Sequence, residues 1–428
     1  MKYFAPIINL LFSKDRMNTM FRALRHHNFK LFVEGQSLSL IGTWIQRIAV
    51  NWLTYELTGS MFWLGAVNFA GSIPFFFIAP LGGIMADRWS KHKILLITQS
   101  LALVQALVFA GIYFADITRI WEILILNFIL GVISAIDMPV RQSFVHEMVD
   151  NDKEDLSNAI AMNSTMVNTA RLVGPSIAGI LIATAGEGWC FLLNSLSFVA
   201  VVISLLKMKI TYVPKQKKKR RVVHEFMEGA KYSFTSIPVK YLLFMMIVMG
   251  LASTALPTLA PAFAEICLNG NAETYGFLIG AWGIGALFSA VYLLNRRSVL
   301  GMERLIAVAL VAFGVSVVAF SLSSKIIIAM IFMATSGIGL LLNNASTNTL
   351  LQTVSENEIR GRVMSFYAMC NKGMSPIGAI ITGYIGDLIG VKYTLAICGI
   401  VCIMSAIIYT TKMQVIKLHV IRKYRKKG

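Results

Sequence analysis

The sequence contains few charged residues. Asp, Glu, Lys and Arg make up only 14% of the 428 residues, whereas apolar residues make up 56%. This balance excludes an ordinary soluble globular protein, in which roughly a quarter of the residues are charged. The composition therefore indicates a protein that has lipid as its main solvent.

Several chemical features are also absent or rare. No Gly-Lys pair occurs in the chain, which excludes a phosphate-binding loop for ATP. All six histidines lie in or beside the predicted cytoplasmic segments, which makes a histidine proton relay across the membrane an unexpected mechanism. The five cysteines are expected to be ordinary buried thiols. We expect no cofactor and no metal ion, and an ion gradient as the energy source.

Long apolar runs are what the sequence has in abundance. About a dozen stretches approach the roughly 20 residues that a membrane span needs. Each must be helical, because backbone polar groups find no water in hydrocarbon. The sequence predicts an all-α integral membrane protein with twelve spans at about 31–55, 62–86, 94–114, 120–146, 156–184, 190–206, 239–262, 275–295, 305–321, 326–352, 363–386 and 393–411.

A basic segment that includes the run Lys215–Arg221 divides these spans into two groups of six. Two similar halves are typical of secondary transporters built from repeats. We predict a basic N-terminal segment 1–30, a six-helix half 31–206, a basic linker 207–238, a second six-helix half 239–411 and a basic tail 412–428.

The basic residues predict how the chain is oriented. Only Arg119, Lys325 and Lys392, out of 39 Lys and Arg residues, fall in the loops on the side opposite the linker. Positive residues favour the cytoplasmic side, so we predict that the linker and both termini are cytoplasmic. The net charge of +18 therefore reflects topology and does not indicate binding to nucleic acid.

Apart from Glu122 and Lys240, which lie within the first three residues of their spans, six charged residues fall within the predicted spans, where a charge is costly and marks a functional candidate. They are Glu34, Arg47, Asp137, Arg141, Arg171 and Lys372. Protonation can neutralise a carboxylate, so Asp137 and then Glu34 are the candidates for proton coupling. Asp137 can instead pair with Arg141, four residues further on the same helix face. Coupling through a loop acid such as Asp87, coupling to sodium, or no ion coupling are the alternatives.

Two arginines fall near the middle of their spans, where a long side chain cannot reach the membrane surface. Arg171 and Arg47 are expected to attract an anionic part of a substrate, and Arg171 can alternatively stabilise a deprotonated Asp137. Lipid contact or interhelical hydrogen bonding explains other polar and aromatic residues equally well. The predicted lining of a substrate cavity comprises Arg47, Arg171, Trp44, Trp52, Asn168, Asn344, Tyr367 and Lys372.

The fifth span contains Gly174, Pro175 and Gly179. Proline removes a backbone hydrogen bond and glycine removes bulk. This helix is therefore expected to bend and to pack closely on a neighbour.

The connection between the second and third spans reads Gly83-x-x-x-Asp87-Arg88-x-x-Lys91-x-Lys93. It resembles the loop motif of the major facilitator superfamily, with Ser90 in place of the usual second glycine. Gly174-Pro175 with Gly179 resembles the motif of that superfamily's antiporting exporters. Gly42-Thr-Trp-Ile-Gln and Arg360-Gly-Arg362-Val-Met-Ser365 resemble its bacterial branch with the enterobactin exporter and macrolide efflux proteins.

The resemblance implies a conformational switch at the loop motif. Asp87 would contact the cytoplasmic start of span eleven when the carrier faces outward, where the positive end of a helix dipole favours a carboxylate. Lys91 would pair with Asp137 or Glu147, and Arg88 would set the charge of the loop. The implied switch comprises Gly83, Asp87, Arg88, Lys91, Arg141 and Arg362.

By this resemblance the protein has the major facilitator fold and is no enzyme. We expect a monomeric secondary active exporter in the bacterial inner membrane, moving a drug-like compound or a siderophore by proton antiport with alternating access. Its expected partners are a small-molecule substrate and the lipid bilayer. A lysophospholipid-type flippase on the same fold is one alternative. A membrane receptor or enzyme is another, although only the basic linker is long enough to hold a further site.

Overall fold

The computed structural model describes residues 22–149, 153–209, 222–296, 298–356 and 359–425. The predicted N-terminal segment up to residue 21, the middle of the linker (210–221) and residues 426–428 lie outside these ranges. All regular structure within the ranges is helical, which confirms the predicted fold class. The short helix η1 (Arg22–Arg25) leads into the first long helix.

The first half consists of six long helices that follow the predicted spans. They are α3 (His27–Thr58), α4 (Met61–Arg88), α5 (Lys91–Phe114), α6 (Ile120–Met148), α7 (Lys153–Ala185) and α8 (Glu187–Lys207). Their packing in lipid requires polar contacts and small residues. Asn194 Nδ2 donates to Gln46 Oε1 (2.6 Å), and Gln46 Nε2 donates to Gln105 Oε1 (3.2 Å), so that buried amides join α3, α5 and α8.

The second half follows α9 (Val222–Thr235), which lies in the predicted linker. Its seventh span is divided at residues 253–254, and its eleventh contains the π-helical segment η2. The elements are α10 (Ile237–Ala252), α11 (Ala255–Leu268), α12 (Ala272–Leu294), α13 (Met302–Ser321), α14 (Ile326–Val354), α15 (Arg360–Ala368), η2 (Met369–Gly373), α16 (Met374–Ile389) and α17 (Val391–Arg425).

Ten helical segments of the described chain are long and apolar enough to cross a membrane by themselves. The two remaining predicted spans are α3, which carries Glu34 and Arg47 on a relatively polar sequence, and the divided helix α15–η2–α16. The largest difference from the predicted boundaries is at the C-terminal end, where α17 continues as a helix from the expected end at 411 to Arg425.

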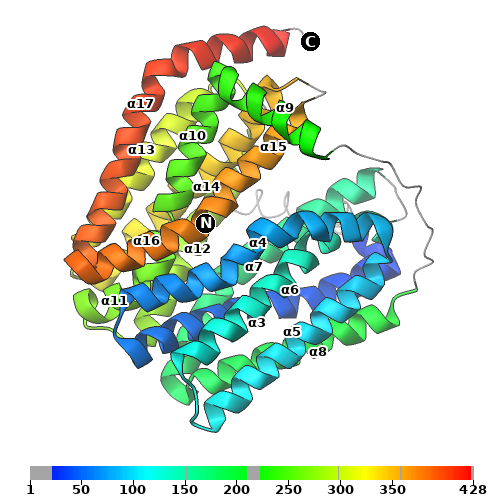
Figure 1. Cartoon of the computed structure of the whole chain (residues 1–428), viewed down its shortest axis with the longest axis vertical. Coiled ribbons are helices and arrows are strands. Elements are labelled where there is room, and N and C mark those ends of the chain that lie inside the picture. Colours follow the sequence, from blue (N-terminus) through cyan, green and yellow to red (C-terminus); the bar gives the residue numbers. More distant parts are fainter. Residues whose placement is uncertain (1–21, 150–152, 210–221, 297, 357–358, 426–428) are drawn as a thin grey trace, which may run out of the picture.

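We call the end of the bundle that carries α9 and the α4–α5 connection the linker side, and the opposite end the far side. Figure 1 shows the two halves as separate bundles that meet through α4 against α16 and α7 against α12. Both contacts include close crossings near the far side. A Cβ atom on Gly65 would lie 2.5 Å from the Ala379 carbonyl oxygen, and one on Gly179 would lie 2.8 Å from that of Ala272. The small residues let the two halves touch there.

Candidate functional site

Three positively charged side chains come together between the two halves. Arg47 on α3 and Arg171 on α7 lie on the same aromatic ring, with guanidinium carbons 4.9 and 5.8 Å from the centroid of Trp44. Lys372 comes from η2 in the other half, and its ammonium group lies within electrostatic range of both guanidinium groups. We call Arg47, Arg171 and Lys372 the cation group.

The residues of the cation group are at least partly accessible to solvent. Arg47 and Lys372 are solvent-exposed although protein surrounds both charged ends. Arg171 is half-buried, and its Nε atom is buried without a hydrogen-bond partner. No carboxylate of the described residues forms an ion pair with any of the three. Like charges that repel one another without a counterion favour the binding of an anion.

The local sequence explains why Arg47 and Arg171 lie close together. A Cβ atom on Gly174 would lie 2.5 Å from Trp44 Cβ, so only glycine lets α7 approach α3 closely enough for both arginines to share that ring. On its other side α7 packs on α12, where Gly276 lies against the Pro175 carbonyl oxygen and against Gly179. The close packing predicted for this motif is confirmed.

The π-helical segment presents the third cation. Met369–Gly373 is wound more loosely than an α-helix, and such segments occur frequently at functional sites. Close contacts hold it on both sides, because Gly250 of α10 lies against the Cys370 carbonyl oxygen and Gly373 lies against the Phe76 ring of α4. The segment thereby changes the helix register at Lys372.

The other predicted cavity residues divide into two groups. Tyr367 Oη donates to the Asn344 carbonyl oxygen (3.0 Å), which joins these two residues beside η2. Asn168 is half-buried, and its Nδ2 donates to the Ser164 carbonyl oxygen of its own helix (2.9 Å). Trp52 stacks on Tyr275 of the other half, with ring centroids 6.4 Å apart.

The first candidate for proton coupling is a fully bonded carboxylate. Asp137 is only 5% exposed and accepts hydrogen bonds from Thr98 Oγ1 (2.9 Å) and Gln99 Nε2 (2.7 Å). Its second oxygen pairs with Arg141 Nε at 3.3 Å. Of the two predicted arginine partners, Arg141 is the one that pairs with Asp137, and Arg171 is not among the described partners of this carboxylate. Its role in proton coupling stays a prediction.

Glu34, the second candidate, is exposed near the linker-side end of α3. Its place there is compatible with either a proton-carrying group or a surface residue. Its role also stays a prediction.

The structure describes part of the implied switch. Lys91 Nζ donates to Glu147 Oε1 (2.5 Å), which selects Glu147 over Asp137 as the partner implied by the resemblance. Ser90 is the N-cap residue of α5, which is compatible with its replacing glycine. Gly83 lies within α4 and Arg362 in the first turn of α15. The side chains of Asp87 and Arg88 lie outside the described residues.

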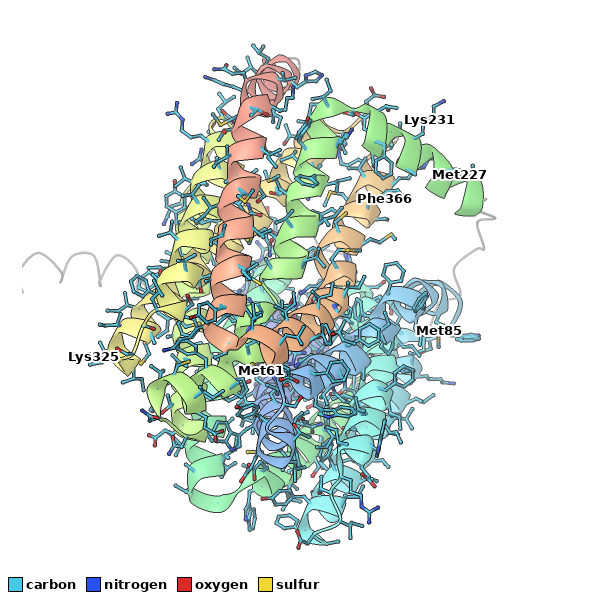
Figure 2. The ribbon with its side chains drawn as sticks, turned by 60° about the vertical axis from the view of Figure 1, so that its left-hand side comes forward. Met61, Met85, Met227, Lys231, Lys325 and Phe366 are labelled. Atoms are coloured by element: carbon cyan, nitrogen blue, oxygen red, sulfur yellow. The ribbon has the colours of Figure 1, made fainter. Side chains whose placement is uncertain are left out.

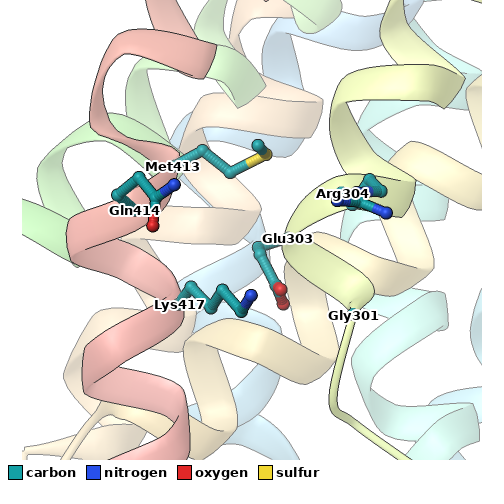
Figure 3. Close-up of a pocket in the computed structure, with 6 residues that line it drawn as sticks. All are labelled: Gly301, Glu303, Arg304, Met413, Gln414 and Lys417. Atoms are coloured by element: carbon teal, nitrogen blue, oxygen red, sulfur yellow. The ribbon is translucent and has the colours of Figure 1, made fainter.

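A partly open pocket of about 220 Å³ lies elsewhere, between α13 and α17 on the linker side. Figure 3 shows Glu303 and Lys417 pointing toward each other across it. All its lining residues come from one half, so the interface between the halves is the better substrate site. The lining residues are Gly301, Glu303, Arg304, Met413, Gln414 and Lys417.

The sequence did not point to a group of contacts between the halves on the far side. Asn68 Nδ2 donates to Asn51 Oδ1 (2.9 Å), and Asn51 Nδ2 donates to the Tyr275 hydroxyl of the other half (3.2 Å). The carboxylate of Asp387 bonds the first turn of α4. Polar residues in or beside apolar helices were the available signal, but their partners lie more than 200 residues away in the chain.

A family model described as "Transmembrane secretion effector" matches residues 18–423. The chain belongs to this family of the major facilitator superfamily. It is similar to the Staphyloferrin A transporter of Staphylococcus aureus (strain NCTC 8325 / PS 47), with 26% identity over 91% of this chain and 98% of that one. Macrolide efflux protein A of Streptococcus pyogenes is 22% identical over 90% of this chain and 96% of its own length.

Solved structures agree on the fold. The nucleoside transporter NupG superposes with a TM-score of 0.71 over 90% of this chain and 98% of that one, at 14% identity. This family member is thus a multi-pass membrane efflux transporter, as the sequence predicted in outline.

Proposed function

We propose that the protein is a secondary active exporter of a small anionic amphiphile, such as a siderophore or an acidic drug-like compound. The cation group carries this proposal. Three positive charges from both halves meet at the interface without a described carboxylate, and Trp44 supplies an apolar face beside them. A substrate with several carboxylates and an apolar portion satisfies both features.

We place the protein in the bacterial inner membrane, with the linker side and both termini in the cytoplasm. The far-side crossings of α4 with α16 and of α7 with α12 support a state that is closed to the exterior. In that state the substrate would enter the cation group from the cytoplasm. Separation of the far-side contacts would then release it outside, which is alternating access.

The energetics of an anion suit export. An inside-negative potential of about 100 mV favours outward movement of each negative charge by about 2.3 kcal/mol. A proton that enters in exchange adds to this driving force, with Asp137 or Glu34 as the candidate carrier. We propose that the protein works as a monomer in the bilayer, without a cofactor, and that it binds no nucleic acid.

Reconstitution in liposomes that contain a pH-sensitive dye tests the proposal. Anionic chelators, a neutral macrolide and a lysolipid are offered to the wild-type protein and to Arg171→Gln. We expect saturable transport and proton flux with the chelators, both strongly reduced in Arg171→Gln. Arg304→Gln is the matched control, because Arg304 is exposed on α13 away from the interface.

Transport of the macrolide alone would contradict an anionic substrate. Movement of lysolipid without solute transport would favour the flippase. Substrate transport without proton flux would remove the antiport part of the proposal only.

A further inference from the structure

Asp387 joins the two halves at the far side. It lies near the C-terminal end of α16, and its carboxylate accepts hydrogen bonds from Ser60 Oγ (2.5 Å) and from the backbone N–H groups of Met61 (2.6 Å) and Phe62 (3.1 Å). These groups form the start of α4 in the other half. Figure 2 shows Met61 at the place where α4 meets α16.

The arrangement is a helix cap supplied by the other half. Ser60 is the N-cap residue of α4, but its side chain does not bond the first turn, and Asp387 satisfies the free N–H groups in its place. A carboxylate at the C-terminal end of its own helix is disfavoured by that helix's dipole. Asp387 therefore gains its favourable surroundings only when α4 lies beside α16.

The hydrogen bonds of Asp387 and the closure of the far side occur together for steric reasons. Gly65 of α4 and Gly383 of α16 cross directly next to Asp387, and a Cβ atom on Gly383 would lie 3.1 Å from Gly65 Cα. The backbones touch at this crossing. Rotation of one half away from the other at the far side must break all three hydrogen bonds of Asp387.

We infer that Asp387 is the positioning residue that holds the far side closed during the transport cycle. The inference rests on the alternating access of the proposed function. It also pairs Asp387 with Asp87, since α4 and the divided helix α15–η2–α16 run antiparallel and each carries an acid near its C-terminal end. Asp387 caps α4 at the far side. By the family resemblance, Asp87 meets the start of α15 at the linker side in the opposite state.

Figure 2 agrees with this reciprocal arrangement. Met85, near the linker-side end of α4, and Phe366 of α15 lie apart, whereas Met61 and α16 lie together. One cap is formed at the far side while the ends that would form the other are separated. The two acids would thus favour opposite states of one carrier.

Spin labels on far-side loops of each half test the inference directly. Ile117→Cys and Ser324→Cys place labels on exposed residues, while four of the five native cysteines are buried. Distances between the labels are measured by double electron–electron resonance in reconstituted full-length protein. We expect Asp387→Asn to raise the ratio of far-side-open to far-side-closed protein about tenfold, in line with the loss of a charged helix cap.

Two variants distinguish a residue that holds the far side closed, which we call a gate, from a residue that only stabilises helix α4. Asp116→Asn removes an exposed far-side carboxylate in the connection between α5 and α6, and it is expected to leave the distances unchanged. Ser60→Asp added to Asp387→Asn restores a cap to α4 from within its own half. If Asp387 is a gate, the far side remains open in this double variant.

An unchanged distance distribution in Asp387→Asn would overturn the inference. Full recovery by Ser60→Asp would overturn it as well, because Asp387 would then only stabilise α4. The measurement needs no substrate, so a failure here is distinguishable from a wrong assignment of the exported anion.

Discussion

Two groups of charges inside the helix bundle differ in one respect. Asp137 has three partners, and Lys91 is paired with Glu147, so these charges are neutralised within one half. The cation group lies between the halves and has no described counterion. Because an uncompensated charge in a membrane protein is costly, we expect the first group to stabilise the structure and the second to bind an anionic ligand.

Removal of a cation should have the largest effect on transport. We expect Arg171→Gln or Lys372→Gln to reduce kcat/KM by about 10- to 100-fold, because a charge-assisted hydrogen bond contributes roughly 1.5–3 kcal/mol. Thermal stability should stay equal or rise, since repulsion within the cation group is relieved. Transport assays and melting curves of the same preparations check this. Lower stability with unchanged transport would mean that the cation group stabilises the structure and does not bind the substrate.

Asp137→Asn should produce the opposite pattern. The change leaves the partly buried Arg141 without its carboxylate, so we expect a loss of about 1–3 kcal/mol in unfolding free energy, with substrate affinity unchanged. Arg141→Gln added to Asp137→Asn should restore part of the loss. Denaturation and substrate-binding titrations measure the two quantities.

A selective loss of proton flux at full stability in Asp137→Asn would assign proton coupling to this residue. The Asp137–Arg141 pair would then have a role in transport as well as in stability.

Replacement of the shared ring should have a smaller effect. Trp44→Leu removes the aromatic face that contacts both guanidinium groups, at a cost of about 0.5–1 kcal/mol for an accessible cation–π contact. We expect a two- to fivefold loss of substrate affinity, in line with that energy. Trp44→Phe should recover much of it, and equal losses in both variants would argue against the cation–π contact.

The smallest expected effect is on the pH dependence of stability, and it comes from acidic residues at the far side. Glu56 lies beyond the predicted span 31–55, and burial followed by the charge and hydrogen bond of Glu187 raises its pKa to about 7. A carboxyl whose folded pKa exceeds its unfolded value holds a proton more tightly when folded. Stability should therefore fall as pH rises from about 4.5 to about 7.

Glu56→Gln should flatten this part of the pH–stability curve. Melting temperatures across that range measure the effect. An unchanged slope would show that Glu56 does not contribute to the pH dependence of stability in this range.

Much of this molecule was predictable from the sequence for a clear physical reason. Lipid requires continuous apolar helices, so hydropathy located the spans and the two halves. Isolated charges in those spans likewise identified Arg47, Arg171 and Lys372. The pairing of Asp137 with Arg141 remained one of two possibilities, because spacing shows which groups share a face but not what else faces them.

Contacts between the halves were beyond such reasoning. Asn51 with Tyr275 and Asp387 with Met61 join residues that only the packing of two bundles brings together. The π-helical segment at Lys372 was also unforeseen, because it depends on tertiary contacts at Gly250 and Gly373. The side chains of Asp87 and Arg88 lie outside the described residues, so their predicted contacts stay predictions.

The absence of a described counterion in the cation group has a practical consequence for purification. A site that repels itself when empty is stabilised by any small multivalent anion that enters it, in proportion to the logarithm of the anion's concentration. Citrate, phosphate or sulfate in a buffer would act as ligands of the carrier and compete with its substrate. Chloride-only buffers would report its affinity most faithfully, whereas polyvalent anions would give the most durable preparations.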